Sequence, residues 1–107
     1  MSKTITIQIG NSDNKLTQQE WAEYVNDLKK LTQPFNVHFS GGSPIDAPWQ
    51  NYCTVLVLTN GQYLCVYQEI LKGMLAELCD KYRQDSIAVT TGDTEFIGRN
   101  YEVKKGQ

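Results

Sequence analysis

The spacing of hydrophobic residues in this chain switches between that of a strand and that of a helix. From Lys3 to Ile9, isoleucine alternates strictly with polar residues, which is typical of a strand with one buried face. Thr17 and Glu20 then form a capping-box pattern, and a helical stripe of apolar residues follows until Pro34. These patterns predict a strand followed by an amphipathic helix.

Three more strands are predicted further along. Phenylalanine and valine alternate with polar residues over 35–40, and residues 53–59 are an almost continuous apolar run. A short last strand is expected over 86–90. Residues 41–51 form a long connection between the second and third strands, and long loops in compact domains are often functional.

The segment after the third strand has two interpretations. Asn60-Gly61 is a hairpin signal, which would make Gln62 to Tyr67 a strand. Apolar residues nevertheless keep helical spacing without a break as far as Tyr82. We therefore favour a helix over 62–82, with Asn60 near its N-cap.

The resulting order, β-α-β-β-α-β, is the ferredoxin-like arrangement of the α+β class. It predicts an antiparallel four-stranded sheet with two helices on one face, in the spatial order fourth, first, third, second strand. We expect one domain over 1–97, a flexible tail over 98–107, and a turn at Thr91-Gly92-Asp93. Leu56 and Leu58 are expected on the open sheet face, where the tail or a second subunit in a homodimer would cover them.

In this topology three polar stretches fall at the same end of the sheet. Their members are Asn11, Ser12, Asp13 and Lys15, then Trp49, Gln50 and Asn51, and finally Arg83, Gln84, Asp85 and Ser86. Alone, each stretch is more often a set of turn and cap residues. Together they suit a small polar or nucleotide-like ligand, with Arg83 and Lys15 on its anionic part.

Trp49 supports a second interpretation of this end. A lone tryptophan in a loop usually folds back onto the core. If exposed, it would be a stacking platform for a base or an anchor for a partner. The alternative function is therefore a protein-interaction module that uses Trp49 and the 41–51 loop as its anchor.

Composition and motifs argue against several other classes. The net charge of −2 predicts no extended nucleic-acid partner, and no apolar stretch is long enough to span a bilayer, so a cytoplasmic protein is expected. Cys53, Cys65 and Cys79 lack metal-binding spacing and are expected to be buried free thiols. Asp13 and Asp85 leave a small hydrolase as a third alternative, but ion pairs with Lys15 and Arg83 are simpler. The sequence therefore favours a non-enzymatic protein without deciding the question, and no metal or cofactor is expected.

Several runs of the chain resemble small uncharacterised proteins of tailed bacteriophages and actinobacteria, over most of residues 5–97. These runs are residues 9–17 with Trp21, Trp49-Gln50-Asn51, residues 83–88 and Thr94-Glu95-Phe96. The resemblance carries no activity. It implies a phage accessory protein that counters a bacterial defence system, either by blocking a host protein or by sequestering a signalling nucleotide.

Overall fold

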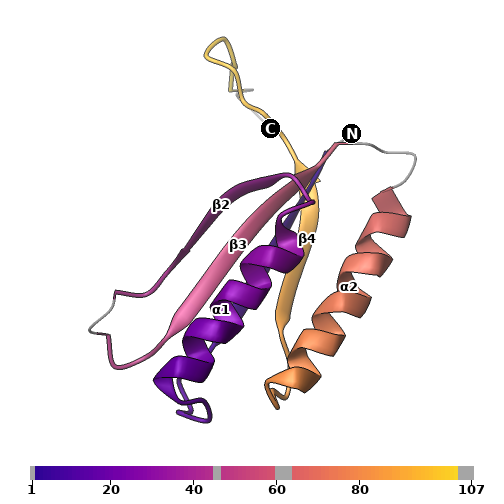
Figure 1. The fold of residues 1–107 in the computed structure, drawn as a ribbon. Helices are drawn as coiled ribbons and strands as arrows, with labels where there is room; N and C mark the ends of the chain where they lie inside the picture. The colour runs from indigo at the N-terminus through magenta and orange to yellow at the C-terminus, as the bar shows by residue number, and fades with distance from the viewer. Residues whose placement is uncertain (1, 45–46, 60–63, 104–107) are drawn as a thin grey trace.

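The structure is a computed structural model that describes residues 2–44, 47–59 and 64–103. Its elements are β1 (Ser2–Gly10), α1 (Gln18–Thr32), β2 (Val37–Gly42), β3 (Asn51–Leu58), α2 (Leu64–Lys81) and β4 (Ala88–Thr94). Both helices lie on the same face of one sheet (Figure 1). The predicted ferredoxin-like α+β fold is confirmed.

The four strands pair in the order β2-β3-β1-β4, and every pairing is antiparallel. β1 is central: Lys3 pairs with Leu58 of β3, while Gln8 pairs with Ala88 of β4. This is the predicted spatial order. It leaves β2 and β4 as the edges of the sheet.

β4 is longer than predicted, because it continues through the residues expected to form a turn. Gly92 pairs with Thr4, and Asp93 pairs with Lys3 and also forms an ion pair with it. The Thr94 hydroxyl hydrogen-bonds that of Thr4. The turn prediction at residues 91–93 is wrong, since the partner strand offers backbone and side-chain partners that local propensity does not include.

The helix boundaries follow the local signals. At the start of α1 the Glu20 backbone N–H donates to Thr17 Oγ1 at 3.1 Å, and Thr17 N–H donates to Glu20 Oε1 at 3.0 Å, so the capping box is confirmed. α1 ends at Thr32, before Pro34. α2 is helical from residue 64, which decides residues 64–67 in favour of the helix; the hairpin signal at residues 60 and 61 lies outside the described residues.

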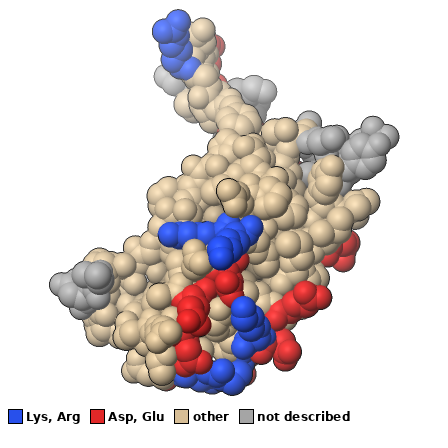
Figure 2. Space-filling view, in the orientation of Figure 1, with Lys and Arg blue, Asp and Glu red and all other residues tan. Residues whose placement is uncertain are grey.

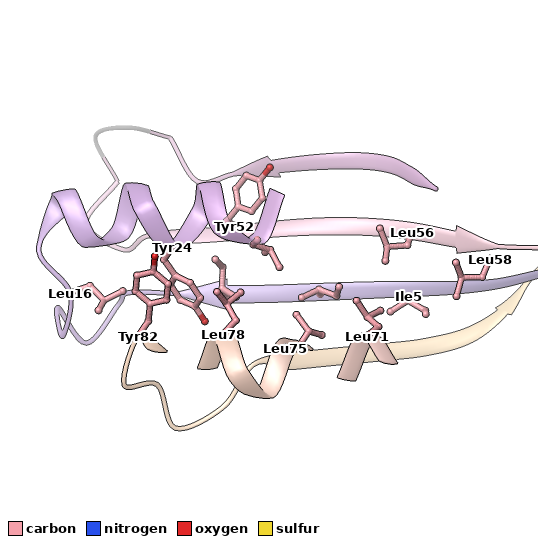
Figure 3. Close-up of a cluster of buried hydrophobic side chains, with 13 residues drawn as sticks. Ile5, Leu16, Tyr24, Tyr52, Leu56, Leu58, Leu71, Leu75, Leu78 and Tyr82 are labelled. Carbon is pink, nitrogen blue, oxygen red and sulfur yellow. The ribbon is translucent and has the colours of Figure 1, made fainter. Parts of the chain in front are cut away.

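The core lies between the helices and the inner face of the sheet (Figure 3). Its buried members are Ile5, Ile7, Ile9, Leu16, Tyr24, Leu28, Tyr52, Leu56, Leu58, Leu71, Leu75, Leu78 and Tyr82. The rings of Tyr24 and Tyr82 stack at a centroid distance of 4.6 Å and join α1 to the end of α2. Burial raises the pKa of both tyrosines above the ordinary value, so both stay neutral.

The prediction that Leu56 and Leu58 face outward is wrong. They are 0% and 8% exposed and belong to the core, because Leu56 pairs with the inward-facing Ile5 of β1. Val55 and Val57 take the outer positions instead. β3 is apolar on both faces, so its pattern does not reveal which face is buried.

This correction removes Leu56 and Leu58 as a reason for covering the sheet face with the tail or a second subunit, and Val57 in its outer position is already only 6% exposed. The tail leaves the end of β4 and projects away from the sheet (Figure 1). Phe96, Ile97 and Tyr101 are exposed along it. A homodimer through the sheet face has no support from Leu56 and Leu58.

Candidate functional site

The three polar stretches meet at one end of the sheet. Asn11 Nδ2 donates to Gln50 Oε1 at 2.9 Å, which joins the first stretch to the second. Lys15 Nζ donates to the Arg83 carbonyl at 3.4 Å and lies 3.7 Å from Asp85 Oδ1, which joins the first stretch to the third. We call this group of residues the polar end.

Asn11 is the centre of the polar end and is only 1% exposed. Its Nδ2 donates to the Leu16 carbonyl at 3.0 Å, and its Oδ1 accepts from the Leu16 backbone N–H at 2.9 Å. The Asn11 side chain therefore supplies hydrogen-bond partners to the Leu16 backbone N–H and carbonyl in the turn before α1. Asn11 is saturated by the protein itself.

Three charged residues of the polar end form ion pairs. Lys15 pairs with Asp85, one of the two predicted aspartates, whereas Arg83 Nη2 lies 2.8 Å from Glu20 Oε2 of α1. The backbone N–H of Thr17 and the Arg83 guanidinium hold the pKa of Glu20 below its ordinary value. Figure 2 shows basic and acidic side chains intermixed on the helical face.

Asp13 and Arg83 also shape the backbone of the polar end. Asp13 Oδ1 accepts from the Lys15 backbone N–H at 3.1 Å, which is a local turn bond. Asn14 and Arg83 both have φ of 56°, a left-handed conformation that is uncommon outside glycine. Turn formation therefore explains much of the polarity of these stretches.

A pocket of about 670 Å³ lies on the opposite, outer face of the sheet at the same end. The residues that line it come from all four strands, from the β2–β3 connection and from the α2–β4 connection. They are Gln8, Ile9 and Gly10, then Phe39, Gly41, Gly42, Ser43 and Pro44, then Trp49, Asn51, Tyr52 and Cys53, and finally Ser86 and Ala88.

The pocket exists because one row of outward positions across the sheet carries small side chains. Gly41 pairs with Cys53, Cys53 with Gln8, and Gln8 with Ala88. Only Gln8 in this row has a long side chain. We call these four residues the small row, which forms the floor of the pocket.

Phe39 forms a wall next to the small row. It pairs with the outward-facing Val55 and is 59% exposed, whereas simple alternation along β2 predicts it inside. A register shift between Val37 and Phe39 changes the phase of the strand. The ring lies over Gly41, since a Cβ added there would be 3.1 Å from Phe39 Cζ.

Trp49 lines the pocket from the β2–β3 connection and is 52% exposed, so it is not folded onto the core. The backbone around it is fixed. The Asn11 N–H donates to the Gln50 carbonyl at 2.8 Å, the Ser43 N–H donates to the Asn51 carbonyl at 2.9 Å, and the Asn51 N–H donates to Ser43 Oγ at 3.1 Å.

The polar groups that line the pocket are uncharged, and several of them have no protein partner. Within residues 2–44, 47–59 and 64–103, the side chains of Gln8, Asn51 and Ser86 make no hydrogen bond to the protein. They can therefore donate to and accept from a ligand.

The cysteines differ from the prediction of buried thiols. Cys53 in the pocket floor and Cys79 are half-buried, and Cys65 is exposed; all three are free. Among the described residues, no cluster of three histidine, cysteine or acidic side chains is placed to hold a metal ion.

Trp49, Asn51 and Ser86 are the predicted site residues that line the pocket. The other predicted residues belong to the polar end and do not line it: Asn11, Ser12, Asp13, Lys15, Gln50, Arg83, Gln84 and Asp85. Sequence reasoning missed Gln8, Phe39 and Cys53. The alternation along β1 predicts that Gln8 faces outward. Which small residues lie beside it depends on how β1 is aligned with the neighbouring strands, and the sequence does not show that alignment.

No protein-family model matches the chain, and no curated protein matches it. Within the described part of the chain, neither helix combines the length and the apolar character needed to cross a membrane. The fold and the pocket together define a ferredoxin-like α+β domain with a hollow on the outer sheet face, whose described lining residues include aromatic side chains and are uncharged.

Proposed function

We propose that this chain is a non-enzymatic binding protein that holds a small polar, nucleotide-like ligand at one end of the sheet. The observation that carries the proposal is the pocket that Phe39 and Trp49 help to line. Its volume of about 670 Å³ is typical of small-molecule sites, which span about 300–1,000 Å³. Stacking of a base on an aromatic side chain contributes about 1–3 kcal/mol.

The chemistry of the lining favours binding over hydrolysis. Cys53 places a thiol in the floor, but among residues 2–44, 47–59 and 64–103 those that line the pocket include no histidine or carboxylate to act as its base. His38, the single histidine of the chain, lies on β2 and contacts the Asn36 side chain at 3.1 Å. The described lining therefore offers no base for a hydrolase.

The resemblance to small phage and actinobacterial proteins supplies a biological context for this proposal. A phage-encoded protein of this kind would act in the host cytoplasm. There, sequestering a signalling nucleotide would counter a bacterial defence system. Binding alone suffices for that role, so it needs no catalytic residue.

The test uses the fluorescence of Trp49. The chain has two tryptophans, so Trp21→Phe leaves Trp49 as the single reporter. Cyclic dinucleotides, NAD derivatives and mononucleotides are titrated into this variant, and melting is followed in parallel. We expect one class to change the fluorescence and to raise the melting temperature, because a ligand that binds the folded state stabilises it.

Trp49→Ala should abolish the rise in melting temperature, and Tyr101→Ala is the matched control. Tyr101 is an exposed aromatic residue of the tail that does not line the pocket. If no compound of the panel changes melting or fluorescence, the ligand-binding proposal is rejected.

A second candidate function is a protein-interaction module that blocks a host protein through the 41–51 loop. It is favoured by the exposure of Phe39 and Trp49 beside one hollow, since interface hot spots are rich in aromatic residues. This function predicts capture of a host protein that Trp49→Ala prevents. In that case none of the nucleotides tested would change the melting temperature or the fluorescence of Trp49.

A further inference from the structure

We infer that the pocket recognises the uncharged, flat heteroaromatic part of its ligand and leaves any phosphate outside. The inference rests on the proposed function and narrows it to recognition at the level of a nucleoside. Gln8 would determine which ring is accepted.

The first support is the absence of charge. None of the residues that line the pocket within the described ranges is Lys, Arg, Asp or Glu. The two cations of the polar end are engaged elsewhere, Arg83 with Glu20 at 2.8 Å and Lys15 with Asp85 at 3.7 Å. A phosphate inside the pocket would lose water without gaining a cation.

The second support is the position of Gln8. In the small row it lies between Cys53 and Ala88, and the short side chains of these two neighbours leave room for a ring beside the Gln8 side chain. A primary amide both donates and accepts, and can pair with the polar edge of a base. Phe39 and Trp49 supply apolar surface for the faces of that ring.

The experiment compares each nucleoside with its own monophosphate. Adenosine, guanosine, cytidine, uridine and nicotinamide riboside, together with their 5′-monophosphates, are titrated by calorimetry at low and at high salt. We expect the best nucleoside to bind within about threefold of its monophosphate, with an affinity that salt hardly changes, because no ion pair is formed.

Gln8→Leu keeps the size of the side chain and removes the amide. We expect it to weaken binding of the preferred nucleoside by about tenfold or more, the loss typical of a two-bond contact to a base edge. Gln19→Leu is the matched control, since Gln19 is an exposed glutamine of α1 outside the pocket. It should leave the affinity unchanged.

Binding that requires a phosphate, and that weakens as salt rises, would overturn the inference while leaving the proposed function standing. Equal loss of affinity in the Gln8 and Gln19 variants would also overturn it. Failure of every nucleoside and monophosphate to bind would overturn the inference. The proposed function would be overturned with it only if the cyclic dinucleotides and NAD derivatives also failed to bind.

Discussion

Replacing Asn11 by alanine separates a structural role of the polar end from a ligand-binding one. The substitution removes three hydrogen bonds: Nδ2 to the Leu16 carbonyl at 3.0 Å, Nδ2 to Gln50 Oε1 at 2.9 Å, and the Leu16 N–H to Oδ1 at 2.9 Å. Both Asn11 and Leu16 are buried. The two backbone groups of Leu16 would therefore lose their partner in a place that water reaches poorly.

The magnitude follows from these contacts. A hydrogen bond contributes about 1 kcal/mol net, and a buried group left without a partner costs about 1–3 kcal/mol. Water entering the space left by the side chain would offset part of this loss. We therefore expect Asn11→Ala to lower the free energy of unfolding by about 2–4 kcal/mol. For a domain of this size, that lowers the melting temperature by about 10–20 °C.

The assay is urea unfolding followed by circular dichroism, with Ser12→Ala as the control. Ser12 is the exposed neighbour of Asn11, and its side chain makes no hydrogen bond with the described residues. The control should stay within about 0.5 kcal/mol of the wild type. A loss below about 1 kcal/mol for Asn11→Ala would refute the structural role and would make Asn11 a candidate ligand contact again.

Two further predictions concern glycine positions in the sheet and the stability of the protein at low pH. A Cβ at Gly42 would lie 2.6 Å from a backbone oxygen of β3, whereas one at Gly92 would meet nothing within 4 Å. We expect Gly42→Ala to destabilise by about 1–3 kcal/mol and Gly92→Ala to be neutral or slightly stabilising; equal urea midpoints would contradict this. The Lys81 ammonium and Tyr82 hydroxyl donate to Asp27 and hold the pKa of its carboxyl below the ordinary value. A lowered folded pKa means that this stabilisation is complete above the unfolded pKa and is lost as pH falls through the folded one. Stability should therefore decline below about pH 4, and Asp27→Asn should make that decline shallower in urea titrations across this range.

Local patterns predicted the elements well, because each signal acts within a few residues. The isoleucine alternation defines β1, and the Thr17 and Glu20 capping box defines the start of α1. The spatial order of the strands then follows from the topology, since each crossover leaves a gap for a strand from the other half. The convergence of the polar stretches followed from the same topology.

Features that depend on register could not be predicted in this way. Both faces of β3 are apolar, so Leu56 and Val55 exchange places if the phase is misjudged by one residue. The irregularity after Val37 moves Phe39 to the outer face. The small row exists only when all four strands are aligned, and no single segment of the sequence carries that information.

The polar end and the pocket are structurally linked, because both include residues of the segment around Trp49. On the inner side, the Asn11 backbone N–H donates to the Gln50 carbonyl, and Asn11 Nδ2 donates to Gln50 Oε1. Gln50 Nε2 in turn donates to Gln18 Oε1 at 2.7 Å. On the outer side, Trp49 and Gln8 line the same pocket. We therefore expect Asn11 and Gln50, which sequence reasoning assigned to ligand contact, to act as positioning residues for the pocket. Asn11→Ala should reduce both the stability of the protein and its affinity for the ligand, whereas Gln8→Leu should reduce the affinity alone. A calorimetric titration of both variants below their melting temperatures separates the two effects.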